Sequence, residues 1–308
     1  MHFQLLTALT LLSITTALPS QSTPQGPPQA GLGHPPSFTL PDAEAVPALP
    51  VPGGKPVYNP AQNKRGLAFN DVKYIQSFWG AGTKVNWMYN WDSRIPTGAP
   101  YVQFVPMLWG DGPAHTTNWF GNAQDSINRG ANNILGFNEP DQCFNSGQSC
   151  IGPEQAANSY RKYIQPFGNQ AWLGSPAITN SADGTRWITA FLNNYCRDCQ
   201  VDFVNMHWYG GTNAQEFIGW VQMVKGLIGG RRIWITEFNG GAFTGATETQ
   251  QIQFMKEVLP WLDRTDYVER YAWHMVDPAP TWTHGSLSNL NGQPSLLGWN
   301  YAYNIPRG

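Results

Sequence analysis

The sequence predicts a (β/α)8 barrel, a fold in which eight parallel strands alternate with helices. From Lys64 onward, short apolar segments alternate with helix-like segments, and eight such apolar segments occur. Together they extend over roughly the 250 residues that such a barrel requires. An open doubly wound sheet is the alternative. It usually has a Gly-rich phosphate loop after its first strand, and Asn70-Asp71-Val72 is not such a loop.

The expected strands are the short apolar segments. In chain order they are Lys64–Asn70, Val85–Trp91, Tyr101–Trp109, Asn133–Asn138, Trp172–Ile178, Val201–Tyr209, Arg232–Phe238 and Val268–Met275. In a barrel of this kind the functional site forms at the C-terminal ends of the strands.

The expected helices lie in the links between these strands. They are Asp71–Trp79, Thr116–Asn128, Glu154–Phe167, Thr185–Tyr195, Ala214–Ile228 and Glu248–Leu262. The first opens on Asp71, a favoured N-cap residue, and the third has Pro153 at its first turn. The link after Val85–Trp91 is short and Pro-rich, which argues against a helix there.

The N-terminal 60 residues are expected to lie outside the barrel, which occupies residues 61–308. Phe3–Leu12 is a short apolar run followed by small residues, which is typical of a secretory signal over residues 1–18. Residues 19–60 hold about half of the 25 prolines and predict an extended, disordered tether. We therefore expect a secreted protein. A plain spacer is favoured over a cell-wall anchor as the role of the tether.

Composition narrows the classes of partner. The chain has 18 Lys+Arg against 20 Asp+Glu and no basic patch, which argues against nucleic acid. Beyond the signal no apolar run reaches the length of a membrane span. Aromatic residues make up 13% of the chain, including 14 Trp, and indole rings stack on sugars. Most of these Trp are expected in the core. No pattern indicates self-association, so a monomer is expected.

Four cysteines fit a secreted protein: Cys143, Cys150, Cys196 and Cys199. Three pairings are possible. Local pairing within each close pair is favoured, because each would then close a small surface loop. The C-x-x-C spacing of the second pair has no thioredoxin-like context, so a structural disulfide is expected rather than a redox site.

Two of the eight glutamates stand at strand ends. Glu139 follows Asn133–Asn138, and Glu237 lies at the end of Arg232–Phe238. Burying a carboxylate costs free energy, and a structural salt bridge would be a sufficient explanation for either residue alone. Two such residues in matching contexts at the mouth of a barrel favour catalysis.

Paired carboxylates of this kind suit the cleavage of glycosidic bonds. One must be protonated to give a proton to the leaving oxygen, and the other must be ionised to attack or to activate water. A carboxyl separation of about 5–5.5 Å implies a retaining reaction, and about 6.5–9.5 Å an inverting one. Burial and mutual repulsion would raise the pKa of one of them.

Other chemistries are disfavoured. His207, His274 and His284 together with the two glutamates could build a metal site, but no H-x-x-x-H or H-E-x-x-H spacing occurs, so no metal or other cofactor is expected. No Gly-x-Ser-x-Gly elbow occurs, which argues against a serine esterase.

Aromatic residues at strand ends are candidate sugar platforms. Trp109 ends the third strand before Gly110-Asp111-Gly112, and Trp273 ends the eighth. We expect both to contact substrate. Three further aromatic residues share one face of the second strand by alternation and are expected in the core: Trp87, Tyr89 and Trp91.

Three phrases together resemble glycoside hydrolase family 128, a clan A family of retaining enzymes found in fungal alkali-sensitive-linkage-type wall proteins. They are Gly136-Phe137-Asn138-Glu139-Pro140-Asp141, Asn205-Met206-His207-Trp208-Tyr209 and Trp234-Ile235-Thr236-Glu237-Phe238. The resemblance covers roughly residues 64–305. It implies a retaining endo-β-1,3-glucanase whose substrate is β-1,3-glucan.

The resemblance also implies roles for individual residues. Glu139 would be the general acid/base, Glu237 the nucleophile, and Asn138 the partner of the sugar 2-hydroxyl. We expect His207 or Tyr209, at the end of the sixth strand, to hydrogen-bond the nucleophile or the substrate.

Two rival functions remain open. The same barrel could bind wall glucan with little or no catalysis, which the tether and the aromatic content would suit equally well. It could also belong to a related β-glycanase of another linkage, or to an enzyme of exo action.

Overall fold

The structure is a computed structural model that describes residues 64–100, 102–144, 147–241, 244–278 and 285–304. The expected signal and tether, and His284, lie outside the described residues. Within the described part, no helix has both the length and the apolar character to cross a membrane.

Eight parallel strands are present in the described residues. Seven lie inside an expected segment, and β7 extends one residue beyond its expected segment. They are β1 (Arg65–Ala68), β2 (Val85–Tyr89), β3 (Gln103–Phe104), β4 (Asn133–Ile134), β5 (Trp172–Leu173), β6 (Phe203–Tyr209), β7 (Arg232–Asn239) and β8 (Val268–Trp273). One sheet has the order β3-β2-β1-β8-β7-β6, and β4 pairs with β5 in a second sheet.

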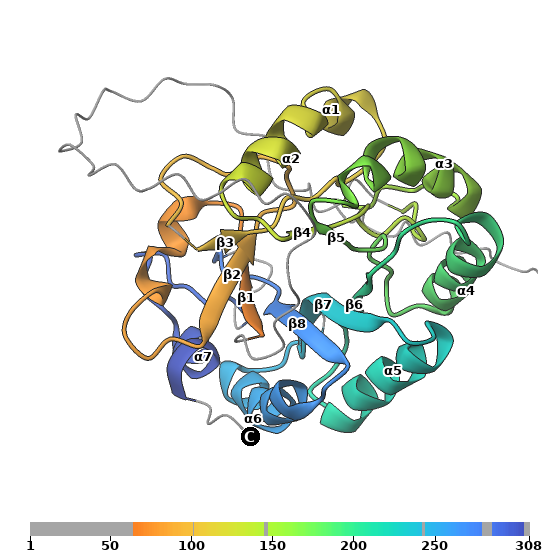
Figure 1. Cartoon of the computed structure of the whole chain (residues 1–308). Coiled ribbons are helices and arrows are strands. Elements are labelled where there is room, and N and C mark those ends of the chain that lie inside the picture. Colours follow the sequence, from red (N-terminus) through yellow and green to blue (C-terminus); the bar gives the residue numbers. More distant parts are fainter. Residues whose placement is uncertain (1–63, 101, 145–146, 242–243, 279–284, 305–308) are drawn as a thin grey trace, which may run out of the picture. The chain divides into compact units, whose positions relative to one another are not determined.

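Single parallel bridges connect the two sheets. Met107, just after β3, pairs with Leu135, just after β4. On the other side, Gly174 and Ile178 pair with two residues of β6, Phe203 and Met206. The result is a mixed α/β fold with parallel strands, with helices outside the strands (Figure 1). This arrangement is consistent with the predicted (β/α)8 barrel.

The main helices follow the expected ones. They are α1 (Pro113–Thr116), α2 (Trp119–Asn128), α3 (Pro153–Tyr163), α4 (Ala182–Ala190), α5 (Ala214–Leu227), α6 (Glu248–Arg264) and α7 (Leu296–Trp299). Pro153 lies at the start of α3, as predicted. The link from β2 to β3 has no helix in its described residues. The two four-residue helices, α1 and α7, were not predicted.

Short 3₁₀ and π turns complete the helical elements. They are the 3₁₀ turns η1 (Val72–Tyr74), η2 (Gln76–Phe78) and η3 (Gln165–Phe167) and the π turns η4 (Phe191–Tyr195) and η6 (Asn300–Asn304). Asp71 caps η1 by accepting from the Lys73 backbone N–H. The expected helix 71–79 is therefore two 3₁₀ turns with a correctly predicted N-cap.

Strand alternation divides the core into two clusters. Trp87 and Tyr89 of β2 belong to a cluster with Trp234 and Ala272, whereas Met88 belongs to the larger cluster that the helices cover. Neighbouring residues of one strand thus enter opposite layers, as a period of two requires.

Both disulfides have the favoured local pairing. Cys143 bonds to Cys150 in the loop between β4 and α3, and Cys196 bonds to Cys199 between η4 and β6. Cys143 and Cys150 are exposed, whereas Cys196 and Cys199 are buried.

Candidate active site

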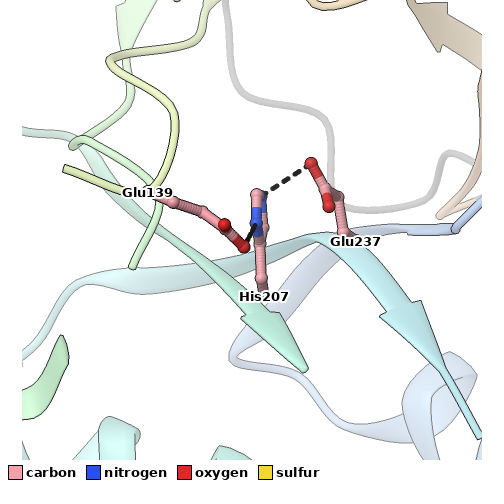
Figure 2. A group of neighbouring side chains, drawn as sticks. All are labelled: Glu139, His207 and Glu237. Carbon is pink, nitrogen blue, oxygen red and sulfur yellow. Dashed lines mark hydrogen bonds and ion pairs between the residues drawn. The ribbon is translucent and has the colours of Figure 1, made fainter. Parts of the chain in front are cut away.

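Glu139, His207 and Glu237 meet at the C-terminal ends of the strands. The His207 Nδ1 atom lies 2.9 Å from Glu139 Oε1, and its Nε2 atom lies 3.4 Å from Glu237 Oε1. Figure 2 shows the imidazole between the two carboxylates. One ligand atom of each residue lies within 4.8 Å of the others, so the two carboxylates approach each other that closely.

The backbone around Glu139 explains how its carboxylate is placed. Gly136 leads out of β4, where an added Cβ would lie 2.7 Å from the Ser175 carbonyl oxygen, so only glycine permits this close approach. Glu139 has a positive φ of 42°, a conformation that is uncommon for residues other than glycine. Its N–H donates to the Ala177 carbonyl over 2.9 Å. This bond fixes the turn against the chain that follows β5.

Glu237 lies within β7, and its position follows from strand register. It pairs with His207 of β6, so the carboxylate and the imidazole leave neighbouring strands at the same level. Glu237 is only 4% exposed. A charged side chain is almost never buried to this degree unless it is paired.

Partners surround both oxygens of Glu237. The Trp91 indole N–H donates to Oε1 over 2.6 Å, and the Tyr209 hydroxyl donates to Oε2. His274 Nε2 lies 3.9 Å from Oε2. Burial acts to raise the pKa of Glu237, but the charges of His207 and His274 and the two donors outweigh it and lower the pKa. The carboxylate therefore favours its ionised, nucleophilic form.

Glu139 has the opposite electrostatic balance. Burial raises the pKa of its carboxyl group, and the nearby charges of Glu237 and Asp141 act in the same direction. The hydrogen bond from His207 opposes this rise without cancelling it. Glu139 therefore favours the neutral form that can give a proton. Two carboxyl groups with pKa values displaced in opposite directions are suited to acid and nucleophile roles.

His207 is held at both ring nitrogens. Its Nδ1 atom contacts Glu139, and its Nε2 atom lies 3.0 Å from the Thr236 hydroxyl. Burial acts to lower the pKa of His207, but the charges of Glu237 and Glu139 outweigh it and raise the pKa. The protonated imidazole, in which both nitrogens donate, is thereby favoured.

The side-chain nitrogen of Asn138 contacts the loop that the Cys143–Cys150 disulfide closes. Its Nδ2 atom donates to the Gly147 carbonyl over 2.9 Å, and its backbone carbonyl accepts from Ser149 N–H. The Oδ1 atom has no hydrogen-bond partner within the described residues, although it is buried. It is the amide atom available to accept a bond from a sugar hydroxyl.

The two expected aromatic platforms lie in different surroundings. Trp109 is half-buried, packs on His115 with ring centroids 4.8 Å apart and planes tilted by 32°, and accepts the Asn138 N–H at its carbonyl. Trp273 is fully buried, donates to the Gly285 carbonyl and packs on Phe238. No face of the Trp273 ring is exposed, so it is a core residue rather than the expected platform.

The position of Trp273 follows from the alternation of β8. Tyr271 and Trp273 enter the helix-covered cluster, whereas Ala272 between them enters the cluster of Trp87 and Trp234. Standing at the end of a strand did not by itself indicate which way the ring would point.

Two site residues were missed by the sequence analysis. Trp91 was expected in the core with Trp87 and Tyr89, but β2 ends at Tyr89 and Trp91 turns to Glu237. His274, just after β8, was considered only as a possible metal ligand. Both residues lay inside the expected strands, whereas the observed strands end before them at Tyr89 and Trp273.

Glu139, His207 and Glu237 are also the group of potential metal ligands found among the described residues. Their donor atoms are already used within the protein, because His207 contacts Glu139 through Nδ1 and Thr236 through Nε2. A single imidazole between two carboxylates would have to break one of these contacts to coordinate a metal. The arrangement therefore suits proton transfer better than metal binding.

Comparison with known proteins also points to a glycoside hydrolase. A family model described as "Glycosyl hydrolase catalytic core" matches residues 66–301. The chain is 32% identical over 223 residues to Alkali-sensitive linkage protein 1 of Schizosaccharomyces pombe. That match covers 68% of this chain but only 38% of the relative, so the chain spans well under half of the relative's length.

Solved structures of glycoside hydrolase family 128 resemble the fold. A curdlan-specific exo-β-1,3-glucanase of subgroup III from Blastomyces gilchristii is 37% identical, with a TM-score of 0.68 over 79% of this chain and 99% of that one. A subgroup II endo-β-1,3-glucanase from Sorangium cellulosum is 27% identical, with the same TM-score and coverage. A subgroup I endo-β-1,3-glucanase from Amycolatopsis mediterranei, bound to laminaritriose, is 27% identical, with a TM-score of 0.64 over 78% and 98%.

Proposed function

This chain belongs to the glycosyl hydrolase catalytic core family, and we propose that it hydrolyses β-1,3-glucan with retention of configuration on a (β/α)8 barrel. One observation carries the proposal. Glu139 and Glu237 are joined by one imidazole at the strand ends, and their pKa values are displaced in opposite directions. A binding protein would have no need of such a pair.

The proposed reaction has two steps. In the first, a Glu237 oxygen attacks the anomeric carbon while the glycosidic oxygen departs with the proton of Glu139, which forms a glycosyl ester on Glu237. In the second, the Glu139 carboxylate takes a proton from water as the water oxygen displaces the ester. Each step inverts the anomeric carbon, so the product retains the configuration of the substrate.

The separation of the carboxylates supports this route over direct displacement by water. Oxygens of Glu139 and Glu237 lie within 4.8 Å of each other, whereas an inverting enzyme separates its carboxyl groups by about 6.5–9.5 Å. The change of role of Glu139 also has a physical basis. Once Glu237 is esterified its charge is gone, and with it one of the influences that raise the pKa of Glu139.

The substrate is proposed from the relatives. The solved relatives are β-1,3-glucanases by name, one of them bound to laminaritriose. Endo action is the first candidate, because the family resemblance implies an endo-β-1,3-glucanase. Exo action is the second candidate, and the observation that favours it is the 37% identity to the curdlan-specific exo enzyme.

Incubation with laminarin and with curdlan tests the proposal. We expect reducing ends from the wild-type protein and a loss of several orders of magnitude in kcat for Glu139→Gln and Glu237→Gln. Glu257→Gln, on the exposed surface of α6, is the matched control and should keep wild-type activity. Binding of laminarin oligosaccharides without any cleavage would favour the glucan-binding rival instead.

Two further measurements refine the result. Proton NMR of the first product gives its anomeric configuration, and an initial α product would exclude the retaining route. Chromatography of early products separates the two modes, because endo action gives a mixture of oligosaccharides and exo action releases one short product. Parallel assays on β-1,4-glucan and β-1,4-mannan test the linkage.

A further inference from the structure

Trp91 occupies an unusual place at the edge of the site. It is half-buried two residues beyond the end of β2, and its indole N–H donates to Glu237 Oε1 over 2.6 Å. A bond from a neutral donor to a charged acceptor is among the stronger hydrogen bonds in proteins. Trp91 therefore contacts the carboxylate on the oxygen that Tyr209 does not reach.

The backbone at Trp91 is held in a conformation that bulky residues rarely adopt. Its φ is +57°. The turn is fixed on both sides, because the Asp92 N–H donates to the Asn90 side chain and the Asp92 carbonyl accepts from Met107 N–H. Such strain persists where the surrounding structure imposes it, and it clusters at functional sites.

Aromatic contacts restrict the indole ring as well. Its centroid lies 5.0 Å from that of Tyr89 and 5.4 Å from that of His274, the latter in edge contact. The Tyr89 hydroxyl in turn donates to the carbonyl of Thr236, the residue before Glu237. Tyr89 thus contacts the indole ring and also bonds to β7, the strand that carries the acceptor Glu237.

We propose that Trp91 is a positioning residue of the nucleophile, whose indole N–H holds the Glu237 carboxylate in the orientation for attack on the anomeric carbon. This inference rests on the proposed function. Trp87 provides the contrast within the same strand, because its N–H donates over 3.0 Å to the backbone carbonyl of Lys64, a bond without any contact to the site.

Electrostatics agree with this role. Besides Trp91, the groups that face Glu237 are Glu139 after β4, His207 and Tyr209 on β6, His274 after β8 and Tyr89 on β2. The Trp91 bond is one of the contributions that lower the pKa of Glu237 against the effect of burial. Its removal should therefore favour protonation of the nucleophile.

Trp91→Phe tests the inference, since it keeps an aromatic ring and removes the donor. We expect kcat on laminarin to fall about 10- to 100-fold with little change in KM, as loss of a hydrogen bond to a charged group predicts. The acid limb of the pH profile should move to higher pH. Trp87→Phe is the matched control. It should lower Tm but leave the acid limb where it is.

A second readout does not depend on turnover. Carbon-13 NMR of labelled glutamate carboxyl groups follows the ionisation of Glu237, identified by its absence in Glu237→Gln, and its pKa should rise in Trp91→Phe. Asn90→Ala retains the indole but removes a support of its turn. It should shift kcat and the acid limb in the same direction by a smaller amount, and it serves if Trp91→Phe fails to fold.

The outcomes separate this inference from the proposed function. Wild-type activity in Glu237→Gln would overturn the proposed function. The role of Trp91 alone would be overturned if Glu237→Gln is inactive but Trp91→Phe leaves both the acid limb and the pKa of Glu237 unchanged.

Discussion

The Asp141 carboxylate accepts hydrogen bonds from both the backbone N–H and the hydroxyl of Thr179, over 3.1 and 2.5 Å. Asp141 lies beyond β4 and Thr179 lies beyond β5. Their contact therefore links the turn that contains Glu139 to the chain that follows β5. From there, the Asn180 side chain bonds both the N–H and the carbonyl of Tyr209. The chain after β5 thus supports Glu139 on one side and Tyr209, a partner of Glu237, on the other.

Asp141→Asn should move the alkaline limb of activity to lower pH. The Asp141 charge raises the pKa of Glu139, so its removal lets Glu139 lose its proton earlier, while the amide can still pair with Thr179. The measurement is kcat/KM on laminarin from pH 3 to pH 9. Exposed Asp183→Asn, on α4, controls for the general loss of one negative charge, and an equal shift in that variant would contradict the explanation.

The wild-type profile should be bell-shaped. Glu237 must be ionised and its pKa is lowered from 4.5, so the acid limb should lie below that value. Glu139 must be protonated and its pKa is raised from 4.5, so the alkaline limb should lie above it. Initial rates on a soluble oligosaccharide across pH give both limbs. Activity that only rises toward alkaline pH would reverse the assigned protonation states.

Azide should distinguish the two glutamates by product stereochemistry. In Glu237→Ala azide can take the place of the nucleophile and leave an α-glycosyl azide. In Glu139→Ala it can attack the glycosyl ester without base assistance and leave a β-glycosyl azide. Both variants are assayed with an activated aryl β-glycoside of a laminari-oligosaccharide, and the products are identified by NMR. Exchange of the two anomers would exchange the two roles.

Trp109 and Trp273 should respond to substitution in different ways. Trp273→Phe removes a buried N–H bond and ring volume, so we expect a loss of about 1–3 kcal/mol in the free energy of unfolding. Its KM for laminarin should stay near the wild-type value. Trp109→Ala at the half-exposed site should raise KM with a smaller change in Tm. Chemical denaturation and steady-state kinetics of both variants measure the contrast, and the reverse pattern would return Trp273 to the binding site.

Treatment with a chelator should leave activity unchanged. His207 already contacts Glu139 and Thr236 through its two ring nitrogens, and the proposed steps use only carboxylates and water. The protein is dialysed against EDTA and assayed on laminarin, with metal-free buffer as the control. A loss of activity that one divalent cation restores would show that the three clustered side chains bind a metal.

Much of the fold was predictable because its signals are local and repeated. Each expected strand overlaps an observed one, since short apolar runs between polar links are what buried parallel strands need. The segment Asp71–Trp79 was less predictable. Its cap is set by Asp71, but the segment forms 3₁₀ turns, and the bonds of Asp277 to the N–H groups of Asn70 and Asp71 come from the distant end of the chain.

The residues of the candidate site could likewise be predicted only in part. Glu139 and Glu237 could be found because a carboxylate at a buried strand exit is costly and so conspicuous in sequence. Trp91 could not be found, because a tryptophan that continues the alternation of Trp87 and Tyr89 is predicted to be a core residue. The positive φ that turns it away from the strand is not evident in the sequence. The orientation of Trp273 could not be predicted either, because it depends on which residues of β8 face the helices, and packing decides this.

The exposed position of the Cys143–Cys150 bond has a consequence for handling the protein. This bond closes the loop whose Gly147 carbonyl and Ser149 N–H hold Asn138, while the Cys196–Cys199 bond is buried. A mild reductant should therefore open this loop, which lies beside Glu139, before it reaches the buried bond. Protein treated in this way would retain the buried bond yet show low specific activity, and air oxidation would restore the activity. A colour assay of free thiols beside the laminarin assay would reveal such a preparation.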